Sequence, residues 1–543
     1  MFSGHRPLSL SGDIMTVIAR NPILPGFYPD PSICAVGDDY YIVNSSFAYF
    51  PGLPIMHSRD LAHWEQIGNV LTCDSQLPLK DAGVSRGLFA PTIRYNKGTF
   101  YVICTNVSAG GNFIVTATDP AGEWSEPHFI PGADGIDPSL FFDDDGKCYY
   151  IGTHPNPEGC KYDGDWYIYI QEMDIENFLL IGEKVNVWNG AMKGIHWPEG
   201  PHLYKIGEYY YLLHAEGGTG PEHAVCVARS RNVFGPYENN FVNPIFTHRH
   251  LGQRYPIRYV GHADLFQTSK GDWYMVMLAV RSIKGFTTIG RETFLARVVW
   301  ENGWPLVNAG IGILTKELVI DLPEYEQEYA SIPGEDKSYD FTGLSRLGPE
   351  FLALRNPKED LYKLQRNQGL FLKCSKDPIA PIKDLSYLCI RQESHSFEAT
   401  SLLYTDNLYA GAAAGMMLFQ NENYHLRVEV SNGIVYVFLV RNGEEELLIT
   451  DRAESTNLML MLVVTGLTAT VLVRNEKEMK PLIKNIDISS LSTEVAGGFV
   501  GCTVGLYARD LDTERKDPVY ACFRTFTYNQ LVSSKRENTE SEI

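Results

Sequence analysis

Four ionisable residues stand at matching places in this sequence. A loose four-residue pattern occurs five times, as Asp30-Pro31-Ser32-Ile33, Ala90-Pro91-Thr92-Ile93, Asp137-Pro138-Ser139-Leu140, Gly200-Pro201-His202-Leu203 and His262-Ala263-Asp264-Leu265. Asp30, Asp137 and His262 each open one copy, and Glu199 directly precedes another. If the copies occupy equivalent places in a repeating fold, three carboxyl groups and an imidazole converge on one cavity.

Several carboxyl groups around one cavity can perform acid–base chemistry on a glycosidic bond. One carboxyl must give a proton to the leaving oxygen, while an ionised one activates the attacking water. Glu199 follows Trp197 and Pro198, and such apolar surroundings are expected to raise its pKa, which makes it the candidate acid. Asp30 is the candidate base. Asp137 is expected to orient Glu199 and, by like-charge proximity, to help keep it protonated.

Each of these residues, taken singly, also has a structural reading. An aspartate before a proline at a strand start is often a turn or cap residue. His262 could be a core histidine, or it could bind an ordered ion or water. Arg291 could pair with the adjacent Glu292, or it could form a charged fork to sugar hydroxyls or to Asp30. The shared position in the repeat favours the functional readings.

The spacing of the copies predicts the elements that position these side chains. Each copy is followed by an apolar strand, a polar turn and an aromatic strand, and a repeat of this length is typical of a propeller. In a propeller, equivalent positions on the innermost strands lie on one ring around the axis. We therefore predict an all-β protein that begins with a five-bladed β-propeller.

A second domain is expected after the propeller. The propeller is predicted over residues 21–317, followed by a charged linker over 318–337. Residues 338–532 are predicted to form an antiparallel, concanavalin A-like β-sandwich, and Asn432-Gly433 between alternating runs predicts a type I′ hairpin there. Residues 1–20 are expected to be a poorly ordered lead-in, and residues 533–543 a disordered tail.

Composition restricts the partners. The formal net charge of −20 argues against nucleic-acid and anionic-membrane partners, which need basic patches. No apolar run is long enough to span a membrane, and the first twenty residues contain no secretory signal. The ten cysteines form no C-x-x-C pair, so zinc is not expected. Absence of a signal and the cysteine usage favour a cytoplasmic protein. The oligomeric state is not indicated.

Together these motifs resemble glycoside hydrolase family 43, and most closely its two-domain β-xylosidase and α-L-arabinofuranosidase members. The resemblance rests on Asn21-Pro22-Ile23-x-x-Gly26-Phe27-x-Pro29-Asp30-Pro31-Ser32-Ile33, Gly87-Leu88-Phe89-Ala90-Pro91-Thr92-Ile93-Arg94, Asp137-Pro138-Ser139-Leu140, Trp197-x-Glu199-Gly200-Pro201-His202-Leu203-Tyr204, Glu216-Gly217-Gly218-Thr219-Gly220-x-Glu222-His223 and Gly290-Arg291-Glu292-Thr293.

The resemblance implies an inverting exo-glycosidase that removes terminal xylose from β-1,4-xylo-oligosaccharides, with terminal α-L-arabinofuranose as a further substrate. It assigns Asp30 as general base, Glu199 as general acid and Asp137 as the residue that modulates the pKa of the acid. The sandwich is expected to help close the pocket, which favours exo-cleavage. The sequence does not identify which loop of the sandwich reaches the pocket, because segment 510–516 is charged and lacks an aromatic residue.

The resemblance also implies how the terminal sugar is held. Phe47, Phe89, Thr219 and Arg291 are expected to line the pocket, and no cofactor is required. His262 lies where some members bind a central calcium ion. Position 89 is Phe where the family usually has Trp, which affects substrate preference more than activity.

Two other functions remain open at this stage. A propeller without activity could bind carbohydrate or protein, although such a protein has no need for three acids in the central channel. An endo-acting arabinanase would need an open groove and usually has no sandwich.

Overall fold

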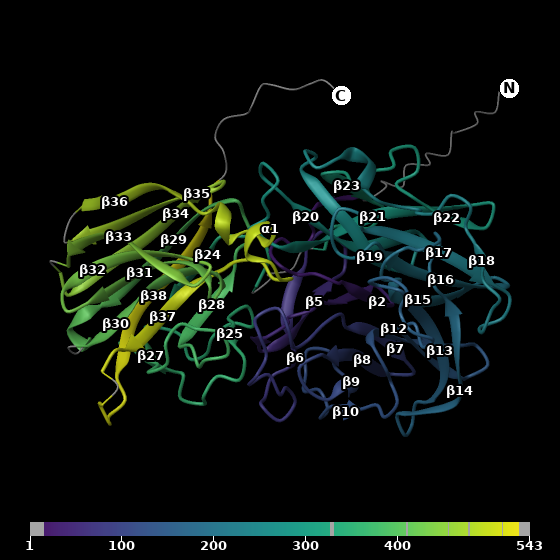
Figure 1. Ribbon diagram of the computed structural model, residues 1–543, viewed down its shortest axis with the longest axis horizontal. Coiled ribbons are helices and arrows are strands. Elements are labelled where there is room, and N and C mark those ends of the chain that lie inside the picture. Colours follow the sequence, from purple (N-terminus) through teal and green to yellow (C-terminus); the bar gives the residue numbers. More distant parts are fainter. Residues whose placement is uncertain are drawn as a thin grey trace, which may run out of the picture.

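The structure is a computed structural model that describes residues 16–325, 331–408, 411–453, 455–475, 478–512 and 514–531. It consists of two β-rich bodies side by side, a propeller and a sandwich (Figure 1).

Five four-stranded antiparallel sheets form the blades of the propeller. They are β2 (Ser32–Val36), β3 (Asp39–Val43), β5 (Gly52–Ser58) and β6 (Glu65–Leu71); β7 (Thr92–Asn96), β8 (Thr99–Asn106), β9 (Gly111–Ala117) and β10 (His128–Phe129); β11 (Ile136–Phe142), β12 (Cys148–Pro155), β13 (Trp166–Asp174) and β14 (Leu179–Trp188); β15 (Glu199–Ile206), β16 (Tyr209–Glu216), β17 (Ala224–Ser230) and β18 (Glu238–Asn239); and β19 (Ile257–Gln267), β20 (Trp273–Arg281), β21 (Arg291–Glu301) and β22 (Trp304–Val307).

The first strands of the blades close a ring. Strands β2, β7, β11, β15 and β19 contact one another in this order, and β19 returns to β2. Four of these strands start at or next to one copy of the sequence repeat, and the fifth, β19, starts five residues before its copy and contains it. The five sheets confirm the predicted five-bladed propeller. The starts of strands far apart in the sequence therefore lie around one axis.

A buried carboxylate joins four of the five blades at this hub. Asp264 of β19 accepts hydrogen bonds from the Ser32 hydroxyl at 2.6 Å, Ile33 N at 3.0 Å and the Tyr204 hydroxyl at 2.5 Å. Arg94 Nη1 lies 2.8 Å from it. Burial alone would raise the pKa of Asp264, but Arg94 and the hydrogen bonds lower it well below its ordinary value. This ionised group fixes the inner strands relative to one another.

The predicted hairpins follow from local turn chemistry. Strands β7 and β8 are joined by Lys97 and Gly98, with φ of 48° and 88°. Positive φ at both central residues is what a type I′ turn requires, and its twist matches that of the strands. Asn432 and Gly433 make the same kind of turn in the sandwich, with φ of 48° and 73°, as predicted.

Two antiparallel sheets form the sandwich. One contains β24 (Lys337–Asp340), β26 (Tyr362–Gln365), β27 (Gly369–Lys373), β29 (Ser396–Tyr404), β34 (Asn457–Thr465), β35 (Thr468–Asn475), β36 (Glu478–Asp487) and β38 (Tyr520–Gln530). The other contains β28 (Tyr387–Arg391), β30 (Ala412–Asn421), β31 (Tyr424–Ser431), β32 (Ile434–Arg441), β33 (Glu444–Arg452) and β37 (Thr503–Asp510).

The remaining elements are short. They are the strand pairs β1 (Val17–Arg20) with β23 (Glu317–Ile320) and β4 (Tyr49–Phe50) with β25 (Ala353–Leu354), the 3-10 turns η1 (Arg249–Leu251), η2 (Thr405–Asn407) and η3 (Ser489–Leu491), and helix α1 (Thr493–Ala496). Among the described residues, no helix is long and apolar enough to cross a membrane.

The predicted chain ends differ from the structure in one place. Residues 17–20, expected to be poorly ordered, form β1, which pairs with β23 at the beginning of the predicted linker. The pairing buries Val17 and Ala19 in the propeller core, which accounts for their order. Residues 1–15, 326–330 of the linker, and the predicted tail 533–543 lie outside the described residues.

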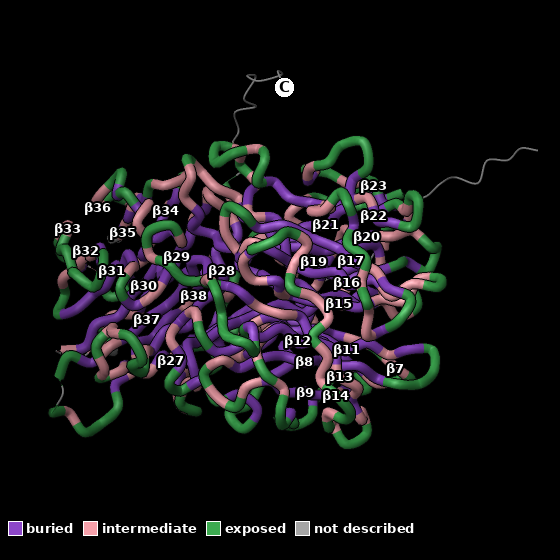
Figure 2. Tube along the Cα trace, turned by 45° about the vertical axis from the view of Figure 1, so that its right-hand side comes forward, coloured by how far each residue is buried: buried purple, intermediate pink, exposed green. Residues whose placement is uncertain are grey.

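Buried residues run along the strands of both bodies, and exposed residues gather in the loops (Figure 2). One apolar core fills the space between the two sandwich sheets. A separate core joins the bodies: Phe27, Phe47 and Tyr49 of the propeller pack with Tyr387 and Phe419 of the sandwich. Because Phe47 also lines the central cavity, the sandwich supports the wall of that cavity.

Candidate active site

The starts of the inner strands surround a cavity of about 710 Å³ at the hub. All eight residues predicted for the site line this cavity: Asp30, Phe47, Phe89, Asp137, Glu199, Thr219, His262 and Arg291. The structure thus brings together residues from all five blades. It leaves none of the predicted residues outside.

Equivalent positions in the repeat share an unusual backbone conformation. Asp30, Asp137, Gly200 and His262 have φ of 52°, 54°, 56° and 46°. Left-handed backbone is uncommon outside glycine, although Asp and His adopt it more often than most residues, and it clusters at functional sites. A Cβ on Gly200 would lie 2.9 Å from the His262 ring. Crowding therefore excludes a side chain at position 200, and the acid of this blade stands one residue earlier, at Glu199.

Asp30 is held in an ionised, oriented state. Arg291 Nη1 donates to its Oδ1 at 2.8 Å, and the Ser45 hydroxyl donates to its Oδ2 at 2.5 Å. His262 Nδ1 lies 3.9 Å from Oδ1. Burial acts to raise the pKa of Asp30, but Arg291, His262 and Ser45 together lower it below its ordinary value. An ionised carboxylate in a cavity is suited to accept a proton from water.

Glu199 has the opposite electrostatic environment. Burial raises the pKa of its carboxyl well above the ordinary value, and the charges of Asp137 and Asp30 raise it further. Burial also raises the pKa of Asp137, to about 6, although His262 and the hydrogen bond from Gly200 N at 3.1 Å act against this. The cavity therefore separates its carboxyl groups into one that stays ionised and one that stays protonated.

An aromatic wall lines the cavity beside these acids. Phe47 and Phe89 meet edge to face, with ring centroids 5.9 Å apart. The Arg291 guanidinium lies 5.7 Å from the Phe47 ring and donates to the Thr219 hydroxyl at 3.2 Å. Aromatic faces next to fixed polar donors are suited to the C–H face and hydroxyls of a sugar ring.

Sequence reasoning missed a fifth member of this wall, Phe499 from the sandwich. Its ring stacks on Phe47 with centroids 6.1 Å apart and meets Phe89 at 5.8 Å. Its backbone N–H donates to the Ser85 hydroxyl at 2.9 Å. The segment that reaches the pocket is therefore 497–502, and not the charged segment 510–516. The Gly497-Gly498-Phe499 sequence, an aromatic after a turn signal, could have indicated it.

Trp166, Trp197 and His223 also line the cavity without having been predicted for the site. Trp166 and Trp197 are half-buried, and His223 is buried. Burial lowers the pKa of His223 to about 3, so this ring is neutral at ordinary pH. None of the three lies at the repeat position that identified the acids, which explains why phase alone did not find them.

The approach of the sandwich segment depends on two glycines. A Cβ on Gly501 would lie 1.7 Å from Ile289 O, and one on Gly290 would lie 2.6 Å from Gly501 N. The two backbones are therefore in direct contact, next to Arg291. We expect Gly501→Ala to separate them, displace Phe499 and Arg291, and raise KM for the substrate about tenfold or more. Steady-state kinetics beside a thermal unfolding curve checks this. An unchanged KM would contradict it. Gly343→Ala is the control, because φ is not positive there and a Cβ would meet only Asp340 O, at 3.8 Å.

The surroundings of His262 allow a test of the calcium expectation. Ca²⁺ takes six to eight oxygen ligands, whereas His262 offers a nitrogen, and the nearby Asp30 carboxylate is already held by Arg291 and Ser45. Among the described residues, no group of metal-ligand side chains includes His262. The protein atoms present therefore do not fit a directly coordinated calcium ion, and we derive no catalytic step through one.

The fold and the site together define a glycoside hydrolase: a propeller whose hub holds carboxyl groups with separated pKa values, closed on one side by a sandwich. The family model for glycosyl hydrolases family 43 matches residues 19–305, and that for the beta xylosidase C-terminal Concanavalin A-like domain matches residues 338–529. This protein belongs to glycosyl hydrolases family 43.

Relatives are similar over both domains. A xylosidase/arabinosidase from Butyrivibrio fibrisolvens is 52% identical over 91% of this chain and 96% of its own length. A non-reducing end alpha-L-arabinofuranosidase from Bacteroides ovatus is 34% identical over 90% of this chain and 91% of its own. The crystal structure of a xylan beta-1,4-xylosidase from Bacillus halodurans C-125 is 32% identical, with a TM-score of 0.85 over 94% of this chain and all of its own.

Proposed function

We propose that this protein is an inverting exo-glycosidase that removes terminal xylose from β-1,4-xylo-oligosaccharides and also accepts terminal α-L-arabinofuranose. The observation that carries the proposal is the separation of carboxyl pKa values in one cavity: the pKa of Asp30 is lowered, and that of Glu199 is raised. The names of the relatives, which include both activities, support the substrate class.

In the proposed mechanism each acid has a separate task. Asp30 takes a proton from the attacking water, and Glu199 gives its proton to the glycosidic oxygen as the bond breaks. Asp137 raises the pKa of Glu199 and keeps it protonated between turnovers. Arg291 bridges Asp30 and Thr219, so that the base and a wall of the sugar site are fixed as one unit.

The position of Phe499 supports exo-cleavage. The sandwich contributes this ring to the wall of the cavity. A groove that binds a long chain would instead have to be open on this side. A pocket closed on one side admits a chain end. This is the observation that favours an exo-acting enzyme over an endo-arabinanase.

Two measurements test the proposed function. Kinetics on an aryl β-xyloside and an aryl α-L-arabinofuranoside should show turnover of both by the same site, with mutual competitive inhibition. NMR during xylobiose hydrolysis should show α-xylose as the first-formed anomer, because single displacement inverts the β-linkage. Turnover of internal bonds in arabinan in place of terminal xylose, or β-xylose as first product, would overturn the proposal.

The pH dependence follows from the two pKa shifts. Turnover needs Asp30 ionised and Glu199 protonated, so a lowered pKa of Asp30 keeps the acidic limb at low pH and a raised pKa of Glu199 moves the alkaline limb upward. Asp137, with a pKa of about 6, is ionised along the alkaline limb. We expect Asp137→Asn to move that limb to lower pH, because a neutral amide no longer raises the Glu199 pKa. A kcat/KM profile with an unmoved alkaline limb would contradict this.

A further inference from the structure

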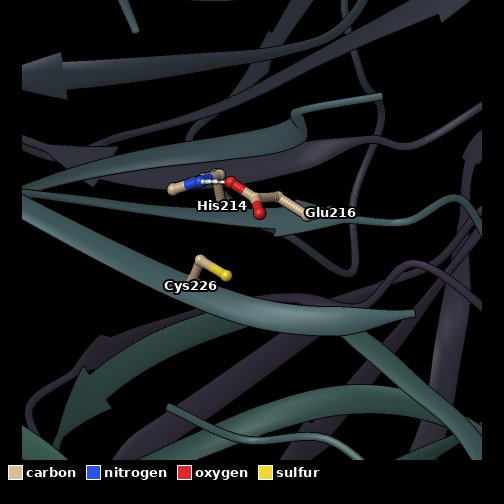
Figure 3. A group of neighbouring side chains, drawn as sticks. All are labelled: His214, Glu216 and Cys226. Carbon is tan, nitrogen blue, oxygen red and sulfur yellow. Dashed lines mark hydrogen bonds and ion pairs between the residues drawn. The ribbon is translucent and has the colours of Figure 1, made fainter. Parts of the chain in front are cut away.

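A buried cluster behind the candidate acid remains without a function. His214 and Glu216 lie on one face of β16, and Cys226 lies opposite His214 on β17 (Figure 3). His214 Nε2 and Glu216 Oε1 are 2.8 Å apart, and both residues are at most 2% exposed. A buried carboxyl group costs stability unless its hydrogen bonds are satisfied. Its partners therefore indicate what it does.

The partners of this cluster come from the segment that leads to Glu199. Ala191 N donates to Glu216 Oε1 at 2.5 Å, and Trp188 Nε1 donates to His214 Nε2 at 3.1 Å. Trp188 is the last residue of β14, and residues 189–198 connect this strand to Glu199 at the start of β15. Glu216 thus holds the beginning of the connection between the third and fourth blades.

The end of the same connection is held by the residue after Glu216. Gly217 N donates to His196 O at 2.8 Å, and Glu199 pairs with Ala215 across the strands. Gly217 itself lines the cavity, two residues before Thr219. A shift at position 216 therefore reaches both Glu199 and Thr219.

These three side chains also place metal-ligand atoms within 4.8 Å of one another. The contacts argue against an ion, however, because Ala191 N–H already binds the Glu216 oxygen and the Trp188 indole already binds the His214 nitrogen. Trp188 Nε1 and Glu216 Oε1 both lie within hydrogen-bond distance of His214 Nε2, so protein groups already engage this nitrogen. The cluster is better explained as a hydrogen-bonded anchor.

We propose that Glu216 is a positioning residue for the general acid: its buried carboxyl group anchors the 189–198 connection and thereby places Glu199 against the leaving oxygen. This inference rests on the proposed role of Glu199. Misplacement of a catalytic group by about 1 Å can cost about 10²-fold in rate. The loss falls on the proton-transfer step, so it depends on the leaving group.

The experiment compares kcat for two substrates. Xylobiose has a sugar as its leaving group, which leaves poorly without a proton, whereas a β-xyloside of a strongly acidic phenol has a leaving group that needs little protonation. We expect Glu216→Ala to lower kcat for xylobiose about 10²-fold and kcat for the aryl xyloside at most about threefold. Glu216→Gln keeps an acceptor oxygen for Ala191 N–H and should recover most of the loss. Glu216→Asp should not recover the loss, because its shorter side chain does not reach Ala191 N–H. This variant replaces Glu216→Ala in the test if the alanine variant does not fold.

A matched control lies at the other end of the same blades. Asp143 links them through Lys205 at 2.7 Å and Tyr210 at 2.7 Å, outside the cavity. Asp143→Asn should leave the ratio of the two kcat values unchanged. If Glu216→Ala loses both activities equally, Glu216 has only a structural role, and that result overturns the inference. If Glu199→Gln also shows no dependence on the leaving group, the proposed role of Glu199 has failed instead.

Discussion

Asp30→Asn is expected to lower kcat about 10³-fold or more on every substrate, including aryl xylosides with good leaving groups. The amide has the same shape and can still accept the hydrogen bond from Arg291, so the cavity should stay intact. It cannot take a proton from water. Because activation of water is needed whatever group leaves, the loss should be similar for xylobiose and for the aryl xyloside.

A control for this prediction removes a partner of Asp30 and leaves its carboxylate. The Ser45 hydroxyl donates to Oδ2 at 2.5 Å and helps lower the Asp30 pKa. Ser45→Ala should therefore move the acidic limb of the pH profile to higher pH, while kcat at the optimum stays within about tenfold. If Asp30→Asn instead retained a rate within tenfold of the wild type, Asp30 would not be the base.

The propeller and its acids could be predicted because both depend on local sequence patterns. The repeated strand starts fixed the phase of each blade, and phase alone placed Asp30, Asp137 and His262 on one ring. The left-handed backbone at these positions was not predicted, since Asp and His give no signal for it comparable to glycine. The position of Glu199 one residue before its repeat was also not explained by the sequence, because it depends on crowding between Gly200 and His262.

The parts of the site that escaped prediction depend on contacts between distant segments. Phe499 reaches the cavity only because Gly501 meets Gly290 across the two bodies, and no periodicity in either segment encodes this contact. The pairing of β1 with β23 joins the beginning and the end of the propeller sequence in the same way. A single sequence indicates strands and turns, but it does not indicate which remote loop fits against which.

Glu199→Gln should have an effect that depends on the substrate. Glutamine keeps the shape of the side chain but has no proton to give, so we expect kcat for xylobiose to fall about 10³-fold. For a β-xyloside of a strongly acidic phenol, which leaves without protonation, the fall should be about tenfold or less. The alkaline limb of the pH profile should disappear on that substrate, because the group whose raised pKa produces it is absent.

The contrast between the two variants separates acid from base. Asp30→Asn should lower both activities, whereas Glu199→Gln should spare the activated substrate, and only a cavity with one carboxyl in each state gives this pair of results. Thermal unfolding of Glu199→Gln should stay near that of the wild type, because an amide replaces a protonated carboxyl of the same volume. Asp30→Asn should unfold at a lower temperature, because it leaves the buried Arg291 guanidinium without its carboxylate partner. Equal losses on both substrates in Glu199→Gln would exclude it as the acid and would leave Asp137, whose pKa is raised to about 6, as the remaining candidate.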